Sequence, residues 1–179
     1  MEESSFLQPA KALQSAKLQA DMRVADFGAG SGFFTRAAAR AVGPTGVVWA
    51  VDINADLLTR IKNISLAEGL QNIEIARGDI ERTGGSQLPE GGFDFVIASN
   101  LFFSLDDKAA GAREVARVLA HGGRALVIDW RDSFGGLGPH PEHVLTIGAA
   151  RDIFEKVGLL YIEDVPAGEY HWGFIVRKK

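Results

Sequence analysis

The fold class of this chain is decided by one stretch, Val24-Ala25-Asp26-Phe27-Gly28-Ala29-Gly30-Ser31-Gly32. An apolar run passes directly into a glycine-rich turn, and a helical pattern follows from Phe33 to Ala41. Glycines permit a tight turn and let a ligand approach bare backbone amides at the start of a helix. This order predicts a nucleotide-like ligand at the loop. The alternative interpretation is a strand-to-helix turn that binds nothing.

The glycine spacing disfavours a dinucleotide. The dinucleotide fingerprint is Gly-x-Gly-x-x-Gly, whereas here the third glycine comes one residue early and Phe33 stands at the required position. The carboxylate of Asp26, beside the loop, would repel a diphosphate but suits a cationic ligand. A nicotinamide dehydrogenase is therefore a weak alternative, also because the chain has no room for a separate substrate domain.

Strand-like and helical stretches alternate along most of the chain. Short runs rich in β-branched or aromatic residues predict buried parallel strands, and apolar residues three and four apart predict helices. This alternation indicates an α/β three-layer sandwich. The predicted strands are Arg23–Phe27, Val47–Asp52, Ile73–Ala76, Phe93–Ser99 and Arg124–Asp129; the predicted helices are Phe33–Ala41, Ala55–Glu68 and Lys108–Leu119, with Gly43, Gly69 and Gly122 as C-caps.

The two ends of the chain depart from this alternation. Leu159–Val165 and Trp172–Arg177 are joined by so short a connection that they predict an antiparallel hairpin. Pro9–Ala20 has helix-forming composition and predicts an N-terminal helical cap within residues 1–20. Phe6 and Leu7, before it, either close over a ligand as a lid or fray. No repeat or linker divides the chain, so we expect a single domain over residues 1–179.

Composition excludes several function classes. The chain has 179 residues, a formal net charge of -4 and no cysteine. Acidity disfavours a nucleic-acid partner, and the lack of cysteine removes thiolate metal sites and thiol nucleophiles. The apolar runs are too short to cross a bilayer, and the acidic start Met1-Glu2-Glu3 lacks the charge of a signal peptide. A soluble cytoplasmic protein is expected.

Two aspartates follow predicted strands. Asp52 ends the second strand, where open α/β sheets present a carboxylate to ribose hydroxyls; alternatively it caps the following helix, a role that Asn54 can fill instead. Asp79 follows the third strand and could accept a hydrogen bond from an exocyclic amine, with Ile80 near the ring. Its alternative role is that of an ordinary turn aspartate.

Over almost its full length the chain resembles the class I S-adenosylmethionine-dependent methyltransferases. The matching stretches are Val24–Gly32, Trp49–Asn54, Gly78–Ile80, Phe93–Asn100 and Val118–Asp129. The resemblance implies a seven-stranded, mostly parallel sheet of order 3-2-1-4-5-7-6 with strand 7 antiparallel, and S-adenosylmethionine as the cofactor, with S-adenosylhomocysteine as its product. Within this class the chain is similar to small stand-alone enzymes related to the ubiquinone and menaquinone C-methyltransferases.

The resemblance also implies the residues that hold the cofactor. They are the backbone of Gly28, Ala29, Gly30 and Gly32, with Asp26 nearby, for the methionine part; Asp52 for the ribose; Ile53, Asp79 and Ile80 for the adenine; and Ser99 and Asn100 beside the methyl group.

Methyl transfer is an in-line displacement that needs positioning and exclusion of water rather than a nucleophilic residue. By location, we consider Asn100, His140, Tyr170 and His171, together with His143, as catalytic candidates; solvated loop side chains are the alternative. His140, Glu142 and His143 lie in a proline-broken loop that gives no face to align metal ligands, so no metal is expected.

Aromatic and charged residues follow the fourth and fifth predicted strands. Four aromatic side chains either wall an apolar acceptor pocket or pack under loops. Asp129, Arg131 and Asp132 either orient a polar acceptor or pair with one another. The four aromatic residues are Phe102, Phe103, Trp130 and Phe134.

The acceptor is expected to be a small, partly apolar metabolite. Ser99-Asn100-Leu101-Phe102 departs from the Asn-Pro-Pro-aromatic and Asp-Pro-Pro-aromatic tetrapeptides of amino-methylating DNA and RNA enzymes. The lack of cysteine departs from the cytosine-C5 and arsenite methyltransferases. The alternatives are a protein or RNA methyltransferase, which would present a shallow acceptor face, and a non-catalytic module that binds S-adenosylmethionine.

Overall fold

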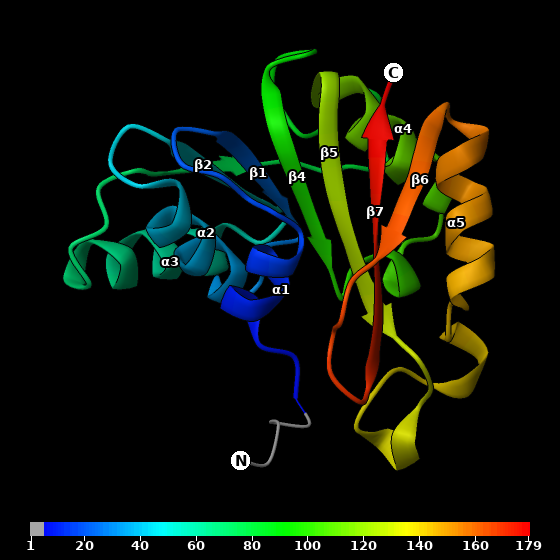
Figure 1. The fold of residues 1–179 in the computed structure, drawn as a ribbon. Coiled ribbons are helices and arrows are strands. Elements are labelled where there is room, and N and C mark those ends of the chain that lie inside the picture. Colours follow the sequence, from blue (N-terminus) through cyan, green and yellow to red (C-terminus); the bar gives the residue numbers. More distant parts are fainter. Residues whose placement is uncertain (1–5) are drawn as a thin grey trace.

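The computed structural model describes residues 6–179 and contains a seven-stranded sheet of order β3-β2-β1-β4-β5-β7-β6 (Figure 1). Strands β1 to β5 are paired in parallel, and β7 lies antiparallel between β5 and β6. The predicted topology is confirmed. The strands are β1 Arg23–Phe27, β2 Val47–Asp52, β3 Ile73–Arg77, β4 Phe93–Ser99, β5 Leu119–Trp130, β6 Leu159–Asp164 and β7 His171–Lys178.

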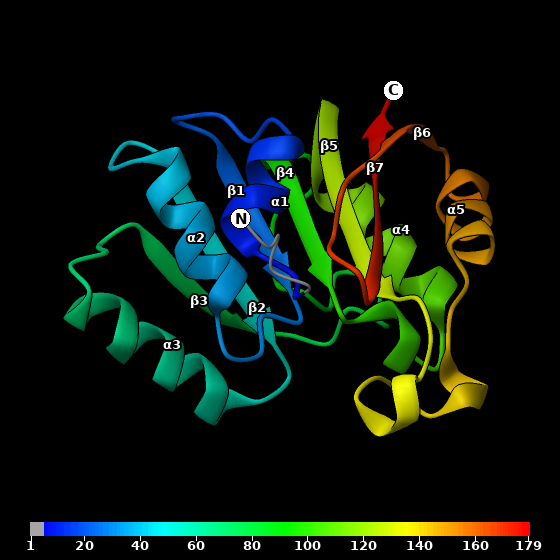
Figure 2. The ribbon, with the colours of Figure 1, turned by 60° about the horizontal axis from the view of Figure 1, so that its bottom comes forward.

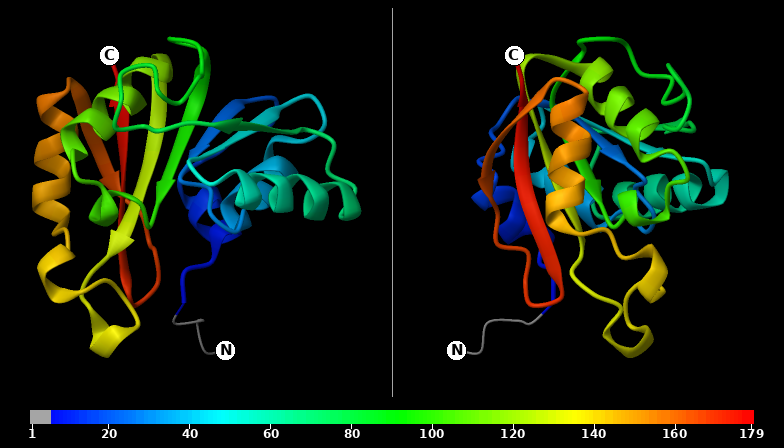
Figure 3. Two further views of the ribbon diagram at one scale, coloured as in Figure 1. Left: turned by 180° about the vertical axis from the view of Figure 1, so that it is seen from behind. Right: turned by 90° about the vertical axis from the view of Figure 1, so that its right-hand side faces the viewer.

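Helices cover both faces of the sheet (Figure 3). Successive side chains of a strand point to opposite faces, so Ala25 and Phe27 of β1 join one apolar cluster while Val24 joins the other. Both faces are apolar, which is why the strands read as continuous apolar runs. The helices on Val24's face are α1 Pro9–Ser15, α2 Phe33–Val42 and α3 Ala55–Ala67; those on the other face are α4 Lys108–Val118 and α5 Ile147–Lys156.

The structure corrects two predicted elements. Gly122 is not a helix C-cap: α4 ends at Val118 and β5 begins at the next residue. Phe93 pairs with Leu119 and Phe95 with Arg124, so the residues between bulge out of the ladder, and Gly122 supplies a left-handed turn there. The N-terminal helix stops at Ser15 rather than Ala20. The first five residues of the predicted cap lie outside the described residues.

Helix α5 was not predicted. Its apolar residues Ile147, Ala150 and Phe154 stand three and four apart, a helical spacing that was overlooked in the sequence. The helix is capped at its start: the Thr146 side chain accepts a hydrogen bond from the Ala149 N–H.

The sheet places the functional site at the carboxyl ends of β1, β2 and β4. Phe27 pairs with Val51 of β2 and with Ala98 of β4, so the residues that follow these strands converge. The chain leaves β1 toward one face and β4 toward the other, and ligands of open α/β sheets bind at such a switch point. The start of β7 and the segment before α1 reach the same end, which Figure 2 brings forward. Within residues 6–179, no helix has the length and apolarity to cross a membrane.

Candidate functional site

The glycine loop after β1 turns through left-handed backbone. Gly28, Gly30 and Gly32 have φ values of 66°, 53° and 78°, a conformation that costs other L-residues free energy. A Cβ at Gly28 would lie 2.7 Å from Leu101 Cδ1. The first glycine is therefore required by its conformation and by the side chain packed against it.

The loop directs few amides toward a ligand. The Gly28 and Ala29 N–H groups both donate to the Val51 carbonyl, at 2.8 and 3.1 Å, and the Gly32 N–H donates to the Ala29 carbonyl at 2.8 Å. The Gly30 N–H donates to Asp52 Oδ2 at 3.0 Å. The expectation that a ligand meets bare amides is wrong for these four groups, because each is engaged within the protein. A phosphate would have to bind through other N–H donors, at Ser31 or in the first turn of α2.

Asp26 lies beneath the loop and is 2% exposed. Its Oδ2 accepts a hydrogen bond from Thr35 Oγ1 at 2.6 Å, which ties β1 to the first turn of α2. Burial raises the pKa of Asp26 to about 7, against the lowering effect of the Thr35 hydrogen bond, and the charge of Asp52 raises it further. A cation bound beside Asp26 would favour the ionised carboxylate.

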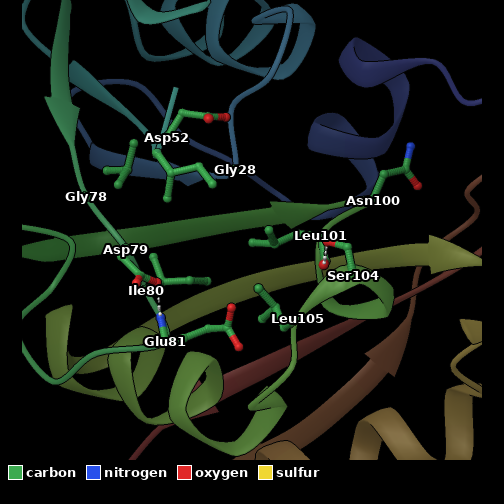
Figure 4. A pocket seen from close by; sticks show the side chains of 12 residues that line it. Gly28, Asp52, Gly78, Asp79, Ile80, Glu81, Asn100, Leu101, Ser104 and Leu105 are labelled. Carbon is green, nitrogen blue, oxygen red and sulfur yellow. Dashed lines mark hydrogen bonds between the residues drawn. The ribbon is translucent and has the colours of Figure 1, made fainter. Parts of the chain in front are cut away.

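On one side of the loop lies a cavity of about 380 Å³, here named the Asp52 cavity. Figure 4 shows the Asp52 side chain on one side of this cavity and Asp79 and Ile80 on the opposite side. Ile53, also in the lining, is 66% exposed, so its side chain is free to contact a ligand in the cavity. The lining comprises Gly28, Val51, Asp52, Ile53, Gly78, Asp79, Ile80, Glu81, Asn100, Leu101, Ser104 and Leu105.

The carboxylates of the Asp52 cavity are held by backbone donors. Asp52 Oδ1 accepts from the Asn54 N–H at 2.9 Å, and Asn54, not Asp52, caps α3. Asp79 Oδ1 accepts from the Glu81 N–H at 3.0 Å, and its Oδ2 forms an ion pair with Arg82 Nε at 3.1 Å. Carboxylate oxygens have two lone pairs each, so both groups keep capacity for a ligand's hydroxyl or amino groups.

On the other side of the loop lies a larger cavity of about 720 Å³, here named the His171 cavity. Its walls come from α1 and the segment before it, the glycine loop, the first turn of α2 and the ends of β4, β5 and β7. The lining comprises Phe6, Leu7, Gln8, Pro9, Ala10, Asp26, Gly28, Ala29, Gly30, Ser31, Phe33, Phe34, Ser99, Asn100, Trp130 and His171.

The two cavities share Gly28 and Asn100. Asn100 has a left-handed φ of 53°, which asparagine tolerates, and its N–H donates to the Ile128 carbonyl at 2.9 Å. The two cavities therefore adjoin at these residues, and a ligand that occupied both would lie against Gly28 and Asn100. Within residues 6–179, neither lining contains a lysine or an arginine.

The structure divides the catalytic candidates. Asn100 and His171 line the His171 cavity, whereas Tyr170 packs between Phe6 and Phe134, with ring centroids 5.2 and 4.9 Å away. His140 and His143 lie outside both linings, and their side chains are 69% and 62% exposed. Each is 3.6 Å from the exposed carboxylate of Glu142.

The aromatic residues after β4 and β5 have different roles. Trp130 lines the His171 cavity, the first of the two interpretations, but Phe102 is fully buried and packs on Phe154 with ring centroids 4.9 Å apart. The interpretation of Phe102 as a pocket wall is wrong because its short helical turn faces the core. Phe134 is 37% exposed and contacts Tyr170.

Asp129 lies outside both cavity linings and does not pair with Arg131 or Asp132. It is fully buried and accepts hydrogen bonds from the N–H groups of Phe103 and Trp130, both at 2.9 Å. Burial raises its pKa to about 6, against the effect of these backbone donors. Asp129 thus fixes the chain after β4, next to Asn100, to the end of β5.

Two features escaped the sequence analysis. Phe33 was noted only as a missing glycine, yet it is 65% exposed, lines the His171 cavity and lies under the Arg36 guanidinium at 5.3 Å. The sequence could have identified Phe33 as a lining residue, because it stands in the first helical turn after the glycine loop. No pattern in the sequence could have predicted the Asp26–Thr35 hydrogen bond, because this bond depends on how α2 packs on β1.

Comparisons with known proteins agree with this geometry. A family model described as "Methyltransferase domain" matches residues 24–123. The ubiquinone/menaquinone biosynthesis C-methyltransferase UbiE of Laribacter hongkongensis (strain HLHK9) is 32% identical over 127 residues, which are 71% of this chain and 50% of that protein. UbiE of Pseudomonas aeruginosa (strain LESB58) is 35% identical over 109 residues, 60% of this chain and 41% of that protein. The chain thus spans about half the length of the curated relatives it matches.

Solved structures match over more of the chain. The crystal structure of a SAM-dependent methyltransferase from Aquifex aeolicus superposes with a TM-score of 0.88 and 26% identity, covering 98% of this chain and 92% of that one. The [4+2]-cyclase SpnF, at 15% identity, has a TM-score of 0.79 over 95% of this chain and 79% of its own, and shows the fold alone. From the matching family model and these relatives, the chain belongs to the class I S-adenosylmethionine-dependent methyltransferases related to UbiE.

Proposed function

We propose that this chain binds S-adenosylmethionine across the two cavities and transfers its methyl group to a small, partly apolar acceptor in the His171 cavity. The observation that carries the proposal is the junction at Gly28 and Asn100, where a site for the nucleoside half and a site for the methionine half and acceptor meet. S-adenosylmethionine supplies a methyl group already activated on a sulfonium.

The residues present fit this cofactor. Asp52 would accept hydrogen bonds from the ribose hydroxyls, with Ile53 and Ile80 packing on the adenine and Asp79 meeting its amino group. The internally bonded loop amides and the absence of lysine and arginine from both linings, within residues 6–179, suit a cationic ligand better than a diphosphate.

The His171 cavity supports an acceptor of limited size. The methionine half would lie over the glycine loop above Asp26, while Ser99 and Asn100 border the methyl group. The apolar side chains of Phe6, Leu7 and other lining residues would exclude water from the reacting atoms, and close approach in line accounts for most of the catalysis that such a transfer needs. A cavity walled by the N-terminal segment favours a small molecule over a protein or RNA surface.

Calorimetric titration with S-adenosylhomocysteine tests the cofactor site, with NADH as the comparison ligand. Stoichiometric binding of S-adenosylhomocysteine and none of NADH is expected; the reverse would refute the proposal. Incubation with methyl-labelled S-adenosylmethionine and separated cell fractions then tests the acceptor. Label in the small-molecule fraction is expected, and label confined to protein or RNA would reject the acceptor class.

A further inference from the structure

Glu114 of α4 is a buried carboxylate that lies outside both cavity linings; the residue is 1% exposed. Its Oε2 accepts hydrogen bonds from the Gly84 N–H and from Arg117 Nε, both at 2.9 Å. Its Oε1 accepts from the Ser86 N–H at 3.1 Å, from Ser86 Oγ at 2.5 Å and from Arg117 Nη2 at 2.7 Å. A buried ion pair contributes little net stability, so the segments that this network joins are its more informative feature.

The network holds the connector between β3 and β4 against α4. Gly84 and Ser86 belong to this connector, and Arg117 Nη2 also donates to the Leu88 carbonyl, at 2.8 Å. Burial opposes ionisation of Glu114, but the hydrogen bonds from Arg117, Ser86 and Gly84 outweigh it and lower the pKa of Glu114 to about 2. The carboxylate is therefore charged near pH 7 and accepts all five hydrogen bonds.

The turn between Gly84 and Ser86 supports the backbone of Asp79. The Asp79 N–H donates to the Gly85 carbonyl at 2.9 Å. A Cβ at Gly78 would lie 2.4 Å from the Gly85 carbonyl oxygen, and a Cβ at Gly85 would lie 2.0 Å from the Asp79 carbonyl oxygen. Two backbone segments are thus in direct contact here, so the position of Gly85 determines the position of Asp79.

The remaining contacts of Asp79 are of a different kind. Its carboxylate accepts from the Glu81 N–H and pairs with Arg82, and both partners belong to the same connector. These contacts orient the side chain relative to the connector but do not place the connector in the fold. The connector is anchored from outside at the end of β2, at the start of α4 and by the Glu114 network. Among these anchors, the Glu114 network reaches the turn that receives the Asp79 N–H.

We infer that Glu114 is a positioning residue for adenine binding, and that it acts on Asp79 through the turn at Gly85. This inference rests on the proposed function and adds the residue that sets the selectivity of the Asp52 cavity for adenine. Glu114 itself does not touch the ligand. Its effect is on the hydrogen bond between the Asp79 carboxylate and the adenine amino group, because such bonds weaken steeply when distance or angle departs from the optimum.

Two ligands that differ in one group test the inference: S-adenosylhomocysteine and its analogue in which a hydrogen replaces the adenine amino group. The wild type is expected to bind S-adenosylhomocysteine about tenfold more tightly, as one hydrogen bond to a charged acceptor allows. Glu114→Gln keeps the side-chain volume but turns an NH₂ group toward N–H donors, so the turn should shift and the preference should fall below about threefold.

The control for a general loss of stability is Val118→Ala, a fully buried apolar change in the same helix. It should lower the free energy of unfolding and keep the tenfold preference, because it removes none of the hydrogen bonds to the turn. Where Glu114→Gln prevents folding, the double variant Glu114→Leu/Arg117→Met gives the same measurement, since apolar side chains then fill the volume of the ion pair. Its preference should also fall below about threefold.

Three outcomes would overturn the inference: no preference for the amino group in the wild type, a full preference in a folded variant that lacks Glu114, or an equal loss of preference in Val118→Ala. Failure of the proposed function is seen separately, as failure of S-adenosylhomocysteine to bind the wild type.

Discussion

The Asp52 cavity and the His171 cavity meet at Gly28 and Asn100, but they differ in how their polar groups are satisfied. The carboxylates of Asp52 and Asp79 are held by backbone N–H donors, so this site keeps its form without a ligand. The His171 cavity is lined by His171, whose buried ring nitrogens have no partner among residues 6–179, and by exposed apolar rings such as Phe33. Under the proposed function, the first cavity is pre-organised for the nucleoside, whereas the second offers a mainly apolar wall to the acceptor.

The largest effect is expected from Asp52→Ala. This change removes the acceptor that fixes Gly30 and the proposed ribose contact, each a charge-assisted hydrogen bond. Affinity for S-adenosylhomocysteine, measured by calorimetry, should fall about 100-fold. Asp56→Ala, an exposed neighbour in the first turn of α3, is the control and should bind normally. An unchanged Kd of Asp52→Ala for S-adenosylhomocysteine would contradict the assignment of the Asp52 cavity to the nucleoside.

The next effect is expected from Gly28→Ala, at the junction of the cavities. The new Cβ takes a left-handed backbone position and drives Leu101 into the Asp52 cavity. Affinity for S-adenosylhomocysteine should fall about tenfold, and backbone strain should cost about 1–2 kcal/mol of stability. Gly69→Ala has a similar positive φ of 77° but open space around its Cβ, so it should lose stability alone. Equal binding losses in both variants would show that strain, not the junction, decides affinity.

A pH effect is expected from Asp26, in the His171 cavity. The folded protein holds the Asp26 proton up to about pH 7, whereas the unfolded chain releases it near 3.8. This contribution to stability is therefore present below about pH 4 and is lost as pH rises toward 7. Urea unfolding of the wild type and Asp26→Asn between these values should show the wild type losing stability relative to the variant. Asp129 and His171 titrate in both proteins, so parallel curves would contradict the raised pKa.

The smallest effect is expected from His140→Ala and His143→Ala. Both side chains are exposed and outside the cavity linings, so stability should change by less than about 0.5 kcal/mol and binding of S-adenosylhomocysteine should not change. A methyl-transfer assay on the labelled small-molecule fraction completes the test. A loss of turnover in either variant would mean that the loop after β5 closes over the His171 cavity.

Much of the fold could be predicted from the sequence, because the spacing of apolar residues reflects which side chains are buried. The strand runs, their alternation with helices and the short final hairpin predicted an α/β sandwich, and the family resemblance supplied the strand order. Asp52 and Ile80 were expected at the cavity that they line. One failure came from a misleading local pattern, because Gly122 marks a bulge in β5 rather than a helix end. The other, α5, was an oversight, because Ile147, Ala150 and Phe154 are spaced as in a helix. At Gly122 the pairing of β5 with β4 outweighs the local signal.

The sequence by itself determined the βαβ order, the glycine spacing and the acidic residues at the strand ends, because these depend on neighbouring residues and on the period of each element. Only the tertiary structure decided which amides of the loop are occupied, that Asp26 is buried against Thr35, and that His171 alone among the candidate histidines lines a cavity. Burial and hydrogen-bond satisfaction are properties of every element packed around a group, and no local pattern encodes them.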